Sequence, residues 1–225
     1  MNWDHVVEKV APYIVKIETP TGHGTGYLFL YNENQSLCGI ATALHVVDYA
    51  NEWQQPIRLI GTTNSIAFLK ETDRVIFHDA RTDSAVILFS VLDFVFPKAL
   101  VPLLPTDTPL SVGAEVGWLG FPSIEPHTMC FFSGNVSARQ EYRQAYLIDG
   151  VAIGGVSGGP VVRCSETDGV QIVGTVSAYR ANRTTGETLP GLLIAQDVSH
   201  FHNVASHVRS IDEAKAQQQM SIESN

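Results

Sequence analysis

The sequence has few cysteines, few basic residues and no long apolar run. Its three cysteines, Cys38, Cys130 and Cys164, are an odd number without close spacing. They predict neither a disulfide framework nor a zinc site, and we expect buried thiols in a reducing compartment. The 14 Lys and Arg against 23 Asp and Glu give a formal net charge of −9, which argues against a nucleic-acid partner because phosphate binding needs a basic patch. No run is long enough to cross a bilayer, and residues 1–10 predict a short polar amphipathic helix rather than a secretory signal. These absences favour a cytoplasmic protein without a membrane partner.

The residues that are abundant suit β structure. Hydrophobic residues make up 44% and charged residues 16% of the chain, with 18 Gly and 11 Pro, a composition typical of a compact protein with many tight turns. Four prolines lie close together near the middle of the chain, at Pro97, Pro102, Pro105 and Pro109. Prolines at this density do not fit central strands, so we expect a surface linker at 97–112. It separates an N-terminal half at 1–96 from a C-terminal half at 113–215, and a frayed polar tail is expected at 216–225.

Short β-branched or aromatic runs bounded by turn residues recur in both halves. Before the linker they are Ile14–Thr19, Gly26–Tyr31, Leu37–Thr42, Ser65–Lys70, Arg74–His78 and Ser84–Phe89, and after it Glu115–Gly120, Thr128–Asn135, Tyr146–Asp149, Gly159–Arg163, Val170–Ala178 and Leu192–Gln196. Six strands on each side predict an all-β fold of two six-stranded antiparallel β-barrels rather than βαβ units. Helix is expected only at the ends. The apolar residues of Val198–Ala214 recur at steps of three or four, which predicts a C-terminal amphipathic helix packed on the second barrel.

The segment GGVSGGP at 154–160 carries the strongest chemical signal. Glycines beside a serine let the backbone turn sharply and approach a substrate closely. This leaves the hydroxyl of Ser157 exposed, as a nucleophile in acyl transfer requires. The amides of Gly155 and Ser157 can converge on one point and form an oxyanion hole. A glycine-rich hairpin with a solvent-facing serine is the structural alternative, because the motif lies between two strand-like runs.

A serine hydroxyl attacks at neutral pH only when a base takes its proton, and histidine suits that task. His45 is the candidate base, because it follows an apolar strand where the chain turns toward a cleft. The base needs a carboxylate to fix its tautomer, and Asp83 directly enters an apolar strand, whereas the competitor Asp79 is interpreted as a solvated turn residue. The pair His200 and His202 would point to different faces of a helix and has no third ligand, so no metal site is expected.

In the order His, Asp, Ser, these stretches resemble the trypsin-like peptidases, most closely the protease domain of the HtrA/Deg group, and differ from the order in subtilisins and α/β-hydrolases. The similar stretches are VVEKVAPYIVKIE at 6–18, GHGTGYLF at 22–29, TALHVV at 42–47, DSAVI at 83–87, VGWLGFP at 116–122, SGNVSA at 133–138, IDGVAIGGVSGGPVV at 148–162 and IVGTVSAY at 172–179. The resemblance implies one domain of two barrels and a serine endopeptidase that acts on a peptide or protein substrate through an acyl-enzyme, without a cofactor. It implies that Ser157 is the nucleophile, His45 the general base and Asp83 the residue that orients the histidine.

The sequence also departs from this family. Secreted digestive relatives have a cystine beside the histidine, where this chain has Val46, and an Asp before the serine that receives a cleaved N-terminus, where it has Val156. Activation by proteolytic cleavage is therefore not expected. HtrA proteins usually have Asn at the positions of Val156 and Ile153, so the oxyanion loop is expected to be set differently. No PDZ domain follows residue 200, so regulation through such a domain is not carried over.

The resemblance also places the walls of the primary specificity pocket. Its base falls at Val151, a side wall at Ser177, Ala178 and Tyr179, and a further position at Gly191. None of these residues is acidic. We therefore expect cleavage after small or medium uncharged residues, and not after Lys or Arg.

Two other functions fit the same fold. A catalytically silent or conditionally activated double barrel could serve as a binding or sensor module, because a fold does not guarantee an activity. An esterase or acyl hydrolase could use the same three residues. Labelling of the serine distinguishes the first alternative from an active enzyme, and comparison of peptide with ester substrates distinguishes the second.

Overall fold

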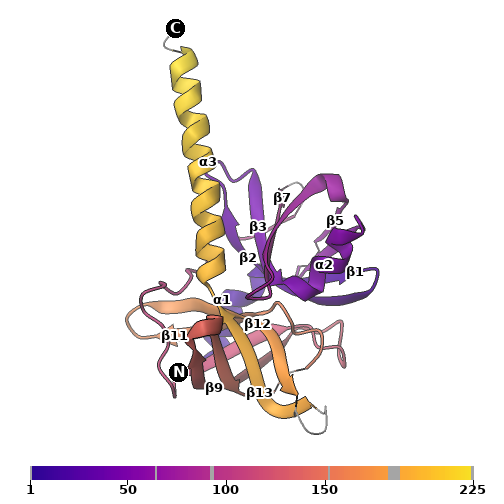
Figure 1. Cartoon of the computed structure of the whole chain (residues 1–225), viewed down its shortest axis with the longest axis vertical. Helices are drawn as coiled ribbons and strands as arrows, with labels where there is room; N and C mark the ends of the chain where they lie inside the picture. The colour runs from indigo at the N-terminus through magenta and orange to yellow at the C-terminus, as the bar shows by residue number, and fades with distance from the viewer. Residues whose placement is uncertain (1, 64, 92–93, 152, 182–187, 224–225) are drawn as a thin grey trace.

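The computed structural model describes residues 2–63, 65–91, 94–151, 153–181 and 188–223, without the side chains at 179–181, 188–190 and 222–223 (Figure 1). The helices are α1 (Trp3–Val10), α2 (Leu44–Glu52) and α3 (Ser199–Glu223), with the short 3-10 turns η1 (Ala11–Tyr13), η2 (Glu71–Asp73) and η3 (Glu141–Arg143). The strands are β1 (Ile14–Thr19), β2 (Gly22–Tyr31), β3 (Leu37–Ala43), β4 (Ile57–Gly61), β5 (Ile66–Leu69), β6 (Arg74–Asp79), β7 (Ser84–Ser90), β8 (Glu115–Gly120), β9 (Cys130–Gln140), β10 (Ala145–Asp149), β11 (Pro160–Ser165), β12 (Gly169–Ala181) and β13 (Thr188–Asp197).

The N-terminal half is an antiparallel sheet with the order β5-β4-β1-β2-β3-β7-β6. It contains seven described strands where six were expected, because β4 was missed. The run IRLIG of β4 is short, and Arg58 within it is exposed, so its apolar signal is weak. Its Ile57 and Leu59 are nevertheless fully buried. Within the described residues, β5 and β6 form the two edges of this sheet, so this half is an open half-barrel rather than a closed barrel.

The C-terminal half is a closed antiparallel barrel with the order β10-β13-β12-β11-β8-β9. All six strands expected after the linker are present, and the all-β fold of a double-barrel type is confirmed. Inward side chains such as Trp118, Tyr146 and Val161 are almost completely buried, as the period-two alternation of strands requires. The expectation of a closed six-stranded barrel therefore holds for this half.

Helix α2 corrects the expectation that helices lie only at the ends of the chain. Its sequence LHVVDYANE begins without a side-chain cap at Ala43 and contains the β-branched pair Val46 and Val47. Both features weaken a helical signal in the sequence. The side chains of Val47 and Ala50 in this helix are fully buried. Packing on the sheet therefore stabilises a helix that local propensity does not favour.

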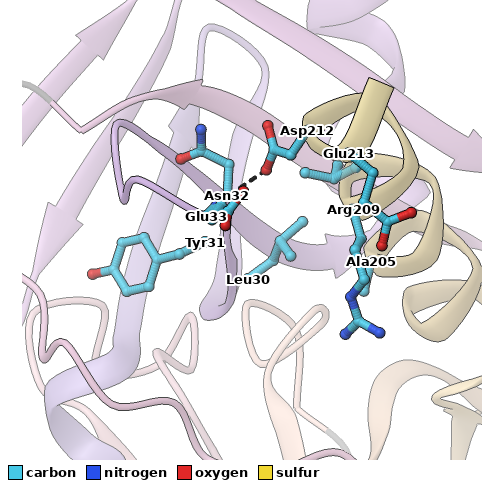
Figure 2. A pocket seen from close by; sticks show the side chains of 9 residues that line it. Leu30, Tyr31, Asn32, Glu33, Ala205, Arg209, Asp212 and Glu213 are labelled. Atoms are coloured by element: carbon cyan, nitrogen blue, oxygen red, sulfur yellow. Dashed lines mark hydrogen bonds between the residues drawn. The ribbon is translucent and has the colours of Figure 1, made fainter. Parts of the chain in front are cut away.

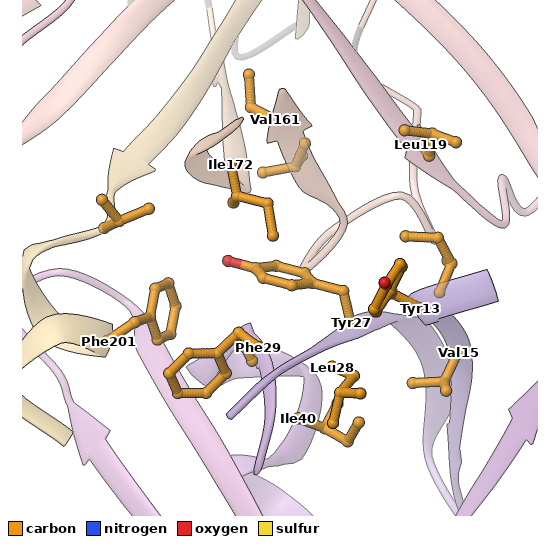
Figure 3. Close-up of a cluster of buried hydrophobic side chains, with 14 of the residues drawn as sticks. Tyr13, Val15, Tyr27, Leu28, Phe29, Ile40, Leu119, Val161, Ile172 and Phe201 are labelled. Carbon is orange, nitrogen blue, oxygen red and sulfur yellow. The ribbon is translucent and has the colours of Figure 1, made fainter. Parts of the chain in front are cut away.

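Helix α3 is longer than expected and packs elsewhere. It continues through residues 216–223, which were expected to form a frayed tail, and it rises along the N-terminal half rather than resting on the second barrel (Figure 1). The ring of Phe201 lies 5.3 Å from that of Phe29 and 6.2 Å from that of Tyr27, both on β2 (Figure 3). Phe201 is fully buried, so this aromatic contact fixes the helix to the first half.

The core runs without interruption between the two halves. Tyr27 of β2 and Thr175 of β12 share a buried hydrogen bond of 2.8 Å between their hydroxyl groups. The linker contributes as well, because Val101 and Leu104 are 2% exposed and the main-chain N–H of Leu104 donates to Ile172 at 2.7 Å. The proline-rich segment is therefore partly buried between the two halves and does not run only over the surface, as was expected.

The cysteines are free, as expected, but they are not all buried. Cys38 is buried, whereas Cys130 and Cys164 are half-exposed. In the part of the chain that the structure describes, no helix combines the length and hydropathy needed to cross a membrane.

Candidate active site

Three segments bring together the histidine, the aspartate and the serine predicted from the sequence. His45 lies in the first turn of α2, and Asp83 immediately precedes β7. The antiparallel register pairs Ala43 with Ser84, and the main-chain N–H of Leu44 donates to the Asp83 carbonyl at 2.9 Å. The end of β3 and the start of β7 therefore hold His45 and Asp83 side by side.

The Asp83 carboxylate accepts three hydrogen bonds. They come from the main-chain N–H of His45 at 3.0 Å, from Nδ1 of His45 at 2.8 Å and from the hydroxyl of Ser177 at 2.6 Å. Asp83 has a φ of +48°, a left-handed conformation that is uncommon outside glycine. The three hydrogen bonds offset the cost of this conformation. The competing Asp79 instead pairs with Arg81 in its own turn, at 3.3 Å.

The contact with Asp83 sets the state of the imidazole. Because a carboxylate only accepts, Nδ1 of His45 must carry the proton, which leaves Nε2 as the acceptor of the neutral ring. The hydrogen bond that His45 donates to Asp83 raises the pKa of His45 above its usual value, burial lowers it, and the charges of Asp83 and Asp48 raise it further. The His45 side chain is 47% exposed, so Nδ1 is held while the ring remains accessible.

Two tight turns form the loop that carries the serine. The Val156 N–H donates to the Ile153 carbonyl at 3.3 Å, and the Gly159 N–H donates to the Val156 carbonyl at 2.9 Å. The third residue of each turn has a positive φ, +90° at Gly155 and +86° at Gly158. This is the geometry of a type II turn, which favours glycine at that position. Ser157 is the second residue of the second turn and lies between the two glycines with positive φ.

Every carbonyl from residue 154 to residue 157 is hydrogen-bonded. The Gly154 carbonyl accepts from the Ser123 N–H at 2.7 Å, and the Gly155 carbonyl accepts from the Thr25 hydroxyl at 2.9 Å. The N–H groups of Gly155 and Ser157 have no protein acceptor among the described residues. In a trans peptide the N–H points away from the carbonyl, so anchoring Gly154 at Ser123 turns the Gly155 N–H to the opposite side. Two donors are thus left free for an oxyanion.

Ser177 links the acid and the serine. Its hydroxyl donates to Asp83, and its carbonyl accepts from the Ser157 hydroxyl at 3.5 Å. Within the described residues, the Ser157 hydroxyl makes this bond rather than one to Nε2 of His45. The sequence placed Ser177 only in a pocket wall, and nothing in its neighbourhood along the chain marked the contact with Asp83.

The other expected pocket residues lie on adjoining segments. Val151 is 54% exposed and Ala178 is also exposed. The Gly150 N–H donates to the carbonyl of Gly191 at 3.0 Å, which ties the segment of Val151 to β13. The side chain of Tyr179 lies outside the described residues. An ideal Cβ at Gly191 would lie 4.0 Å from a carboxylate oxygen of Asp149, an acidic residue that was not predicted as part of the pocket.

The described cavities are separate from this site. Figure 2 shows a cavity of about 380 Å³ between the end of β2 and α3, lined by residues that include Leu30, Glu33, Arg209 and Asp212. The Glu33 N–H donates to the Asp212 carboxylate across it at 2.9 Å. The lining of this cavity contains none of His45, Asp83 and Ser157. Among the described residues there is also no group of three or more His, Cys, Asp and Glu side chains that could hold a metal ion.

Comparisons with known proteins agree with this geometry. A family model described as a trypsin-like peptidase domain matches residues 24–174. No curated protein matches the sequence. Among solved structures, the chain is similar to a mutant of Rv3671c from M. tuberculosis H37Rv in an inactive form, with a TM-score of 0.62 and 16% identity over 90% of this chain and 89% of that one. It is also similar to a serine endoprotease from Yersinia pestis, with a TM-score of 0.67 and 19% identity over 92% of this chain, which spans 66% of the Yersinia chain. These two likenesses concern the fold.

Proposed function

Because the chain belongs to the trypsin-like peptidase domain family, and with it to the serine proteases, we propose that it cleaves peptide bonds through a triad of Ser157, His45 and Asp83. The Ser157 hydroxyl attacks the scissile carbonyl while Nε2 of His45 takes its proton, and Asp83 stabilises the imidazolium. The oxyanion is bound by the N–H groups of Gly155 and Ser157. His45 then donates the proton to the leaving amine, which leaves an acyl-enzyme. Water, deprotonated by His45, hydrolyses the ester and restores the free serine.

One observation carries this proposal. The Asp83 carboxylate holds Nδ1 of His45 at 2.8 Å, and Ser177 links Asp83 to Ser157, whose loop leaves two N–H groups free. Acyl transfer needs a base held in one tautomer and free donors for the oxyanion, and a plain structural turn needs neither.

Labelling with a fluorophosphonate tests the nucleophile. We expect wild-type protein to be labelled and Ser157→Ala to remain unlabelled, with peptide turnover lower by several orders of magnitude in Ser157→Ala and His45→Ala. Ser123→Ala is a matched control, because Ser123 is an exposed serine beside the same loop and keeps its main-chain N–H. Equal labelling of wild type and Ser157→Ala would exclude Ser157 as the nucleophile.

We further propose a preference for small or medium uncharged residues before the cleaved bond. Val151, Ser177 and Gly191 offer no charge to a side chain entering the pocket. Asp149 is an acidic neighbour of Gly191, and it is exposed. A peptide-library profile measures the preference. A strong preference for Arg or Lys that disappears in Asp149→Asn would overturn the proposal and assign the specificity to that carboxylate.

One observation favours a conditionally activated module as the second candidate. The Ser157 hydroxyl bonds to the Ser177 carbonyl at 3.5 Å rather than to Nε2 of His45, an arrangement suited to a resting state. In that case wild-type protein would bind peptides but resist fluorophosphonate labelling until a ligand rearranged the loop. Labelling of the unliganded wild type at the same rate as with saturating peptide would exclude this candidate.

We also propose that the protein works in a reducing compartment. Cys38, Cys130 and Cys164 are all free thiols. Titration should find three thiols, and activity should be unchanged by a reductant. A disulfide detected in the native protein would contradict the proposal.

A further inference from the structure

Thr25 connects the serine loop to the N-terminal half of the molecule. It lies on β2, where it pairs with Lys16 of β1, and it is completely buried. Its main-chain N–H donates to the Ser157 carbonyl at 2.8 Å. Its hydroxyl donates to the Gly155 carbonyl at 2.9 Å and accepts from the Phe121 N–H at 3.0 Å. One residue thus holds two of the loop's carbonyls and the start of the segment that runs alongside it.

The hydrogen bond from the Thr25 hydroxyl to the Gly155 carbonyl restrains the backbone at a residue that has no side chain to limit its rotation. Gly155 has no Cβ and a φ of +90°, so the backbone itself resists rotation there less than at any residue with a side chain. The two peptide groups that flank Gly155 are fixed at Ser123 on one side and at Thr25 on the other. Rotation of the 154–155 peptide would carry the Gly155 N–H away from the position where an oxyanion forms, and rotation of the 155–156 peptide would release the other side of Gly155 and let the residue shift.

Thr25 itself is held rigidly. The Thr42 hydroxyl donates to its carbonyl at 2.7 Å, and the β1–β2 pairing fixes its backbone. A β-branched side chain on a strand has few accessible rotamers, so the hydroxyl keeps one position. Without this hydroxyl, the buried Phe121 N–H and the Gly155 carbonyl would lose the hydrogen bonds that it supplies. The free energy of leaving them unpaired would favour a rearranged loop.

We propose that Thr25 is a positioning residue for catalysis, whose hydroxyl holds the carbonyl of Gly155 and thereby keeps that residue where its N–H can serve the oxyanion hole. This inference rests on the proposed function. Thr25 does not touch the reacting atoms. It acts through the carbonyl of Gly155 and through Phe121, and it couples the sheet that supplies His45 to the barrel that supplies Ser157.

Three variants test the proposal. Thr25→Val keeps the shape and the main-chain N–H but removes the hydroxyl, whereas Thr25→Ser keeps the hydroxyl. Thr175→Val is the matched control, because it also removes a buried threonine hydroxyl bond between the two halves, the one to Tyr27 at 2.8 Å, without touching the loop. Near-ultraviolet circular dichroism confirms that each variant is folded. If Thr25→Val does not fold, Thr25→Ala is compared with Thr25→Ser instead.

The measurements are kcat, KM and the inhibition constant of a peptide boronic acid, whose tetrahedral adduct places an oxygen in the oxyanion hole. Loss of a whole oxyanion donor costs about 10²–10³ in kcat, so a displaced donor in Thr25→Val should cost about 10- to 100-fold. KM should stay within about threefold, because ground-state binding is retained. Boronate affinity should fall in parallel with kcat/KM. Thr25→Ser should restore the activity to near that of wild type, and Thr175→Val should keep kcat.

The outcomes separate this inference from the function on which it rests. An inactive, unlabelled wild-type protein would refute the proposed protease function. With an active wild type, the inference is overturned if Thr25→Val has the kcat and boronate affinity of Thr175→Val. It is equally overturned if Thr25→Ser is as impaired as Thr25→Val, because the hydroxyl would then not be the cause.

Discussion

Replacing Asp83 by asparagine tests how the structure fixes the imidazole. The carboxylate accepts from the main-chain N–H of His45 at 3.0 Å, from Nδ1 of His45 at 2.8 Å and from Ser177 at 2.6 Å. Asparagine offers one accepting oxygen and one donating nitrogen, so its nitrogen must face one of the two groups of His45. The main-chain N–H cannot reverse its role, whereas the imidazole can change tautomer and the Ser177 hydroxyl can rotate. The amide nitrogen should therefore lie opposite Nδ1.

That arrangement moves the imidazole proton to Nε2, which can then no longer accept the proton of Ser157. The expected loss in kcat is about 10⁴-fold, the size that follows a wrong histidine tautomer in a serine protease. At about 1.36 kcal/mol for each tenfold, this corresponds to about 5.4 kcal/mol of transition-state stabilisation. KM should change little, because no contact with the ground-state substrate is lost.

The assay is the steady-state turnover of a peptide substrate by wild type, Asp83→Asn and Asp79→Asn at a pH where His45 is neutral. Asp79 is the matched control, because it is another aspartate near β7 whose bonds go to Arg81 in its own turn. It should keep activity within about twofold of wild type, as is usual for a surface substitution. The reasoning is refuted if Asp83→Asn retains more than about a tenth of the wild-type kcat, or if Asp79→Asn shows the larger loss.

Three further predictions concern the loop and two histidines. Gly155→Ala should lower kcat and boronate affinity together, because its φ is +90° and an added methyl group would meet the Phe121 carbonyl oxygen; a folded variant with wild-type kcat would contradict this. Asp48→Asn should shift the acidic limb of the kcat/KM profile to lower pH, because the Asp48 charge helps to raise the pKa of His45, which must be neutral to act; an upward shift would be inconsistent with this. Burial lowers the pKa of His200, so the folded state should bind fewer protons at this residue than the unfolded chain, and the free energy of unfolding should fall as pH drops below about 6.5. Urea titrations should find that this free energy depends less on pH in His200→Gln. An unchanged pH dependence in that variant would contradict the prediction.

The sequence by itself determined the chemistry that depends on short-range geometry. The glycines around Ser157 predicted a sharply turning loop, and the structure has tight turns with positive φ at Gly155 and Gly158. Short β-branched or aromatic runs bounded by turn residues identified all six strands of the second barrel, because both signals are local in the sequence. Two elements with weak sequence signals were not predicted. Strand β4 was missed because its apolar run is short, and α2 was missed because its uncapped, β-branched sequence gains its helical stability from packing on the sheet.

Only the tertiary structure decided how the site is held. The hydroxyl of Ser177 reaches Asp83 across 94 residues of sequence, and that of Thr25 reaches Gly155 across 130. Propensity and periodicity describe interactions within a few residues, whereas these bonds exist because two sheets that are distant in the sequence pack against each other. The same reason explains α3, whose apolar stripe was visible in the sequence while its partner, the aromatic cluster around Phe29, depended on how the two halves pack.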